Sequence, residues 1–192
     1  VPTGPSLGAP LGTMQAADPI ALASAQHALS LNPDLASAYV AQSMVYKDQW
    51  RWAEADRAFR RAVSLAPGDA EAINQQAQSL LAAGQFNPAL AEIERAQRLD
   101  PLSPSIGTTR GYLLMILRRY EAASAQLQLT LATHPDAVPA RGKALELAVI
   151  RHDYADAEKQ ARLLAALVGA DPDVLASLIQ RIAETHMRAA AV

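Results

Sequence analysis

The histidines are the side chains with the widest reactive chemistry in this 192-residue chain, which has no cysteine. Catalysis or metal binding requires such groups to converge with carboxylates or hydroxyls. His152 is followed by Asp153 and Asp156, but one histidine with two nearby acids is a weak metal site. No serine lies in a nucleophile-elbow motif and there is no glycine-rich phosphate loop. We therefore expect no enzyme, no catalytic residue, no metal and no cofactor. The other three histidines are widely separated along the chain: His27, His134 and His186.

Composition and charge narrow the class of protein further. The net charge is −2 and the pI about 6.1, so the chain lacks the positive field of a nucleic-acid binder. No apolar stretch reaches the roughly 18–20 residues that a membrane helix needs. Hydrophobic residues make up 51% of the chain, rich in the helix formers alanine and leucine. These features predict a folded helical protein with neither direct nucleic-acid binding nor membrane insertion.

The elements that would position any binding residue repeat along the chain. Four prolines recur at a constant spacing of 34 residues (33 to 67, 67 to 101, 101 to 135). Alanine occupies a second column with the same period: Ala55, Ala89, Ala123 and Ala157. Three residues before each alanine stands an aromatic residue: Trp52, Phe86, Tyr120 and Tyr154. Such a period indicates stacked supersecondary units. We expect two antiparallel helices per unit, here named helix A and helix B, which approach closely at the alanine of helix B.

These columns resemble the tetratricopeptide-repeat (TPR) family, in which a small residue, an aromatic and a closing proline occupy the same places. The resemblance covers about residues 20–168. It implies an all-α fold: an α-solenoid of antiparallel helix pairs, with about ten helices. Several positions depart from the pattern. Gly107 and Arg141 replace the bulky residue that opens helix A, and Gly169 replaces the last closing proline. The usual leucine of helix A is replaced in every repeat, by Gln42, Gln76, Arg110 and Ala144.

The repeat register predicts the organisation of the chain. Residues 1–17 contain Pro2, Pro5 and Pro10 and are interpreted as a flexible linker or arm. The repeat domain spans 18–192 and opens with a half repeat, 18–33, whose helix begins at Asp18 with Pro19 in its first turn. Four full repeats follow at 36–67, 70–101, 104–135 and 138–168. A C-terminal helix over 172–190, apolar on one side, is expected to cap the array.

The resemblance implies that helix A of each repeat lines a concave groove that binds a protein segment. The positions that map onto this wall are mostly uncharged: Val40, Met44, Glu71, Asn74, Gln75, Gln78, Thr108, Thr109, Tyr112 and Lys143. Amide and hydroxyl groups among them suit the backbone of an extended peptide, and Tyr112 offers amphipathic contact area. Chaperone-tail-binding members of the family hold a carboxylate with a lysine and arginine clamp. Here Lys143 is isolated, so such a tail is not expected.

Trp50 lies in the predicted turn between the helices of the first full repeat, where glycine is usual. There it is a candidate exposed hot spot for binding. Trp52 is expected to serve packing instead, because it stands in the aromatic column.

Two functions follow from these observations. The first is a protein-interaction scaffold, or adaptor, that holds a protein or peptide partner in the groove. The alternative is a regulatory or oligomerisation module of a larger protein. The runs at residues 49–62 and 91–104 resemble the C-terminal TPR regions of bacterial multidomain signalling and transcription regulators. In those proteins a winged-helix DNA-binding domain or a nucleotide-cyclase domain precedes the repeats. The resemblance favours the cytoplasm, or the periplasm if the parent protein crosses a membrane, and leaves a homo-oligomer open.

Overall fold

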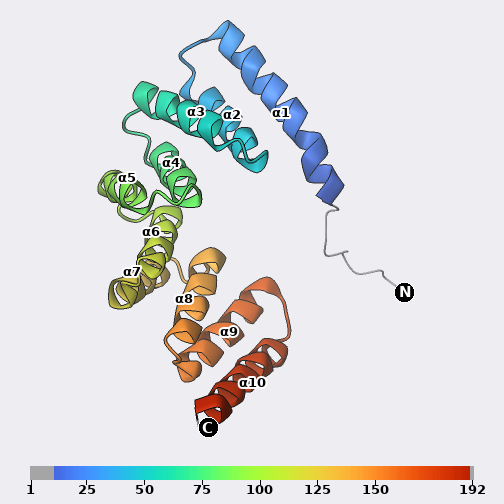
Figure 1. Ribbon diagram of the computed structural model, residues 1–192, viewed down its shortest axis with the longest axis vertical. Helices are drawn as coiled ribbons and strands as arrows, with labels where there is room; N and C mark the ends of the chain where they lie inside the picture. Colours follow the sequence, from blue (N-terminus) through green and yellow to red (C-terminus); the bar gives the residue numbers. More distant parts are fainter. Residues whose placement is uncertain (1–10, 191–192) are drawn as a thin grey trace.

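The helices stack one after another along an arc, from α1 at one end to α10 at the other (Figure 1). The computed structural model describes the backbone of residues 11–190 and the side chains of residues 19–186. That part of the chain holds ten α-helices and no strand. The all-α solenoid of about ten helices is therefore confirmed.

Each full repeat contributes two helices. The A helices are α2 (Ala36–Asp48), α4 (Ala70–Ala82), α6 (Pro104–Ile116) and α8 (Val138–Ile150). The B helices are α3 (Trp52–Leu65), α5 (Phe86–Leu99), α7 (Tyr120–Thr133) and α9 (Tyr154–Val168). The array is flanked by α1 (Leu11–Leu31) and α10 (Pro172–Ala190). The aromatic column thus forms the first residue of every B helix, and the periodic prolines lie two residues beyond the ends of α1, α3, α5 and α7.

The first helix begins earlier than the sequence predicts. α1 starts at Leu11, so the predicted start at Asp18 is wrong and Pro19 lies inside the helix. A proline removes one helical hydrogen bond and bends the helix locally, but it does not forbid the turns before it. Met14, Gln15 and Ala16 are good helix formers and occupy those turns. Residues 1–10 of the predicted linker lie outside the described residues.

The alanine column is where helix A meets helix B. All four column alanines have no exposed surface. Four residues later in each B helix the side chains are also fully buried or nearly so: Phe59, Ile93, Leu127 and Ala161. A methyl group at the crossing lets the two helix backbones approach until the larger side chains on either side interlock.

The repeat around α6 and α7 uses glycine where other repeats use larger residues. A Cβ atom on Gly111 would lie 2.7 Å from Cγ of Leu127, and one on Gly107 would collide with Oγ1 of Thr130. Glycine at both positions therefore makes room for the side chains of α7. The Gly107–Gly111 pair serves close helix packing.

Two arginines that depart from the family pattern are accommodated by hydrogen bonds. Arg141 is 8% exposed, and it donates from Nη1 to Oε1 of Gln160 (3.0 Å) and from Nη2 to the carbonyl of Pro135 (2.7 Å). Arg110 donates to Oε1 of Gln126 over 2.7 Å. The Nε atom of each arginine is buried without a hydrogen-bond partner. These repeats therefore contain buried polar contacts where the pattern predicts apolar packing.

The C-terminal helix covers the array only in part. Ala176 and Ile179 of α10 are buried, and Ile179 belongs to a core cluster with Ala157 and Ala161 of α9. Salt bridges between Arg162 and both Glu158 and Asp173 hold the start of α10 against α9. Leu178 and Ile182 of the same helix are 46% and 45% exposed. Together with Val174, 59% exposed, they form an apolar stripe at four-residue spacing on the outer side of α10.

The contact at Gly111 generates a stability prediction. Gly111→Ala should lower the free energy of unfolding by about 1–3 kcal/mol, because the new methyl group must displace Leu127. Gly142 of α8 is the matched control, since a Cβ built there meets nothing within 4 Å. Gly142→Ala should raise the free energy of unfolding by about 0.5–1 kcal/mol, because alanine has the higher helix propensity. Urea denaturation followed by circular dichroism measures both. Equal effects of the two substitutions would contradict the close approach of α6 and α7.

The A–B turns generate a second prediction. The middle residue of each turn has a positive φ: Trp50 (60°), Gly84 (73°), Arg118 (57°) and His152 (59°). Glycine adopts this conformation freely, whereas for other residues it costs about 1–2 kcal/mol. Arg118→Gly should therefore stabilise the protein by about 1 kcal/mol, and Gly84→Ala should destabilise it by about the same amount. Thermal or urea unfolding measures both changes, and a stabilising Gly84→Ala would contradict the turn geometry.

Candidate functional site: a groove on the A helices

The A helices α4, α6 and α8 form a wall. α4 contacts α6, and α6 contacts α8, in addition to the contacts that each makes with its own B helix. Neighbouring A helices touch because the array curves toward them. The side chains on this wall therefore come from several repeats and converge on one surface.

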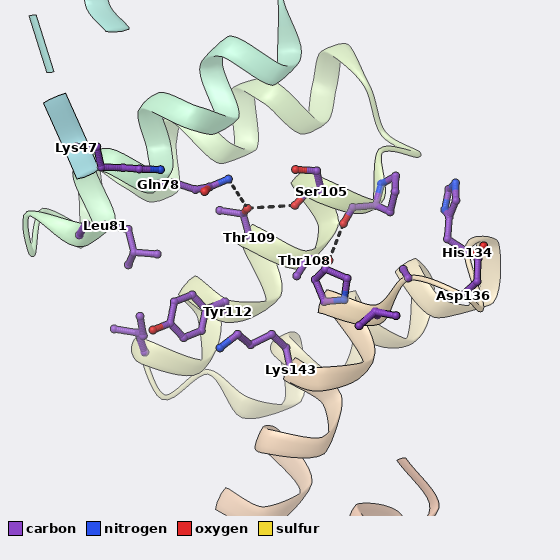
Figure 2. A pocket seen from close by; sticks show the side chains of 16 residues that line it. Lys47, Gln78, Leu81, Ser105, Thr108, Thr109, Tyr112, His134, Asp136 and Lys143 are labelled. Carbon is purple, nitrogen blue, oxygen red and sulfur yellow. Dashed lines mark hydrogen bonds between the residues drawn. The ribbon is translucent and has the colours of Figure 1, made fainter. Parts of the chain in front are cut away.

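A groove of about 1000 Å³ opens on this wall between α4, α6 and α8 (Figure 2). The last turn of α2 closes one end with Lys47, and the α7–α8 loop closes the other with His134 and Asp136. Its apolar surface comes from Leu81, Ala82, Ile116, Ala137, Val138 and Pro139. Its polar surface comes from Gln78, Ser105, Thr108 and Thr109, together with Tyr112 and Lys143.

Hydrogen bonds orient the polar side chains of the groove. Nε2 of Gln78 donates to Oγ1 of Thr109 over 3.3 Å, which links α4 to α6 (Figure 2). The Thr109 hydroxyl donates to the carbonyl of Ser105 (3.1 Å), and the Thr108 hydroxyl donates to the carbonyl of Pro104 (2.6 Å). With its amide nitrogen engaged by Thr109, Gln78 keeps its amide oxygen as an acceptor for a ligand.

Tyr112 and Lys143 form a unit across α6 and α8. The Nζ atom of Lys143 lies 4.0 Å from the centre of the Tyr112 ring, which is a cation–π contact. The same ammonium forms a salt bridge with Glu146 over 2.7 Å. The sequence predicted that Lys143 is isolated, and this prediction is wrong. The i,i+3 spacing brings Glu146 alongside it. Its charge is compensated, which further separates this groove from a carboxylate clamp.

Half of the predicted groove residues line the groove: Gln78, Thr108, Thr109, Tyr112 and Lys143. The other half lies outside it: Val40, Met44, Glu71, Asn74 and Gln75. Val40 packs against the core, and Met44 is 42% exposed on α2. Glu71 accepts a hydrogen bond from Nε2 of Gln75 over 2.8 Å on the surface of α4.

Asn74 is the clearest correction, because it has no exposed surface. Its Nδ2 donates to Oγ of Ser105 (2.8 Å) and to Oε1 of Glu71 (3.2 Å). It therefore joins α4 to α6 and is unavailable to a partner. A residue on the inner wall of one repeat is covered here by the next repeat.

The ends of the groove and much of its apolar surface come from residues that the repeat pattern did not predict. Lys47, Leu81 and Ile116 belong to the last turns of the A helices, beyond the positions assigned to the wall. The 34-residue period relates Lys47 to Leu81, so extending the same columns by one helical turn would have identified both. The loop residues His134 and Asp136 had no such signal.

Trp50 lies in the α2–α3 turn and is not among the residues that line the groove, although its backbone N–H donates to the carbonyl of Lys47 over 2.9 Å. It is 77% exposed, and its ring meets the Trp52 ring edge-on at 5.6 Å. The exposure agrees with the expectation for this position, and its role as a binding hot spot stays a prediction.

The histidine-rich end of the array can be placed as well. His152 stacks on His186 of α10 with ring centres 4.0 Å apart, and its Nδ1 lies 3.1 Å from the Tyr154 hydroxyl. No cluster of three or more metal-ligating side chains occurs in the described part of the chain. Within residues 11–190 no helix is long and apolar enough to cross a membrane.

Comparison of the coordinates with solved structures identifies the fold as that of TPR proteins. PilW, described as a widely conserved type IV pilus biogenesis factor, superposes with a TM-score of 0.78 at 21% identity, covering 88% of this chain and 80% of PilW. TTC0263, a TPR protein of Thermus thermophilus, gives a TM-score of 0.74 at 20% identity over 90% of this chain and 95% of its own.

YrrB, described as a TPR protein with an unusual peptide-binding site, gives a TM-score of 0.63 at 20% identity, with 88% of this chain and 86% of YrrB covered. No family model matches the sequence, and no curated protein sequence matches it either. At these identities the likeness concerns the fold: the chain has the fold of a TPR solenoid.

Proposed function

We propose that this protein is a non-enzymatic interaction scaffold that binds an extended protein segment in the groove between α4, α6 and α8. The observation that carries the proposal is the groove itself, which combines apolar surface with oriented hydroxyl and amide groups from successive A helices. Such a combination suits a peptide, because apolar side chains fill the surface while polar groups pair with the backbone. The peptide-binding site of YrrB, on the same fold, supports the proposal.

The polar groups are already held in place before a ligand arrives. Thr109 and Gln78 are fixed by a hydrogen bond between neighbouring helices, and Tyr112 is held beneath the Lys143 ammonium. Pre-organised side chains lose less conformational entropy on binding, so more of the interaction energy appears as affinity. The groove therefore has the properties of a pre-organised binding surface.

Filling the groove tests this proposal. Random peptides displayed on phage are first selected against the wild-type protein, and their affinity is measured by fluorescence polarisation. Thr108→Trp should lower that affinity at least about tenfold, because the indole occupies the groove. Its matched control is Thr185→Trp on α10, which changes an exposed threonine that also donates to a carbonyl four residues earlier.

The control should bind the selected peptides as the wild type does, with both variants retaining the wild-type circular dichroism spectrum. Selection of no peptide, or equal binding by the two tryptophan variants, would contradict a working groove.

A second candidate is a regulatory or oligomerisation module of a larger regulator, acting in the cytoplasm or the periplasm. The observation that favours it is the exposed stripe of Val174, Leu178 and Ile182 on α10, since exposed apolar patches often mark contacts between proteins. If the stripe mediates self-association, Leu178→Glu should reduce the concentration-dependent mass seen by sedimentation. A wild-type protein that stays monomeric at every concentration would exclude self-association.

A further inference from the structure

The charged side chains of the groove are not equivalent. Two lysines and one aspartate line it: Lys47, Lys143 and Asp136. Lys143 is neutralised by Glu146 over 2.7 Å. Within the described part of the chain, neither Lys47 nor Asp136 has a salt-bridge partner or a side-chain hydrogen bond. The groove thus offers a ligand one uncompensated positive charge and one uncompensated negative charge.

These two charges lie at opposite ends of the groove (Figure 2). Lys47 comes from the last turn of α2, and Asp136 from the loop just before α8. Each stands at the helix end whose dipole favours its charge, which helps to hold it there. This weak interaction with exposed backbone leaves both side chains able to pair with a ligand.

The surface between the two charges is apolar on one side and polar on the other. Leu81 lies beside Lys47 at one end, and Tyr112 lies between Leu81 and Asp136 (Figure 2). Ile116 also lines the groove. The amide oxygen of Gln78 is an available acceptor for a backbone N–H of a ligand, because only the amide nitrogen is engaged, by Thr109. A ligand that follows this surface meets a cation, an apolar floor and an anion in that order.

We propose that the occupant is an extended protein segment with an acidic side chain opposite Lys47, an apolar side chain over Leu81 and Tyr112, and a basic side chain opposite Asp136. The proposal rests on the groove being the binding surface. Complementary charges at the two ends fix the register and direction of the segment along the groove. They contribute more to specificity than to affinity, as is usual for partly exposed ion pairs.

The test compares the peptides that charge-reversed proteins select. One random peptide library is displayed on phage and selected against the wild type, Lys47→Glu and Asp136→Lys. Lys159→Glu is the matched control for the first variant, since Lys159 lies on α9, away from the groove. Glu94→Lys on the exposed surface of α5 is the matched control for the second.

The wild type should select peptides in which an acidic residue and a basic residue flank an apolar one. Lys47→Glu should lose the preference for the acidic residue and keep the apolar one. Asp136→Lys should lose the preference for the basic residue. Each charge reversal should lower the affinity for a wild-type-selected peptide about tenfold. Raised ionic strength should reduce the difference in affinity between the wild type and the variant. Both control variants should select the same peptides as the wild type.

The proposal is overturned if wild-type-selected peptides show no charge preference, or if the reversed variants select the same sequences as their controls. In either case, if Thr108→Trp still fails to bind the selected peptides, the groove remains supported as the binding surface. Selected peptides that Thr108→Trp binds as tightly as the wild type would instead refute the groove itself. The two failures are therefore distinguishable.

Discussion

The close approach of helix A to helix B at a single alanine is the constraint on which the rest of the structure depends. Each column alanine has no exposed surface, so no larger side chain fits without separating the helices. Its methyl group sets the distance between the two helix backbones, and that distance decides which neighbouring positions are filled by large or small residues. Because the constraint recurs every 34 residues, each repeat stacks on the next in a similar way.

The neighbouring positions compensate one another in size. In the α6–α7 repeat, Gly111 faces Leu127, which would clash with any side chain at position 111. In the α8–α9 repeat the sizes are reversed, because Leu145 packs against the cluster that contains Ala161. At this crossing the two repeats thus exchange volume between helix A and helix B. Between repeats, the hydrogen bond from Gln78 to Thr109 joins neighbouring A helices, and that contact forms part of the groove.

Periodicity could predict the helices but only half of the site. The alanine and aromatic columns identify both helices of each repeat, because they reflect contacts within one repeat. Whether the side chain of a wall residue is exposed in the groove depends on how far one repeat rotates relative to the next. Asn74 illustrates this, since Ser105 of the following repeat covers it. The start of α1 was misplaced for a different reason, because a single proline was read as a helix boundary when the chain continues helical through it.

The working surface is tested most directly by nuclear magnetic resonance of the isotope-labelled protein during titration with a selected peptide. If the groove is the binding surface, the largest changes in backbone chemical shift will fall on Gln78, Thr109 and Tyr112 and on the start of α8. The B helices will change little. Largest changes along α3, α5 and α7 would contradict the account and place recognition on the outer side of the solenoid.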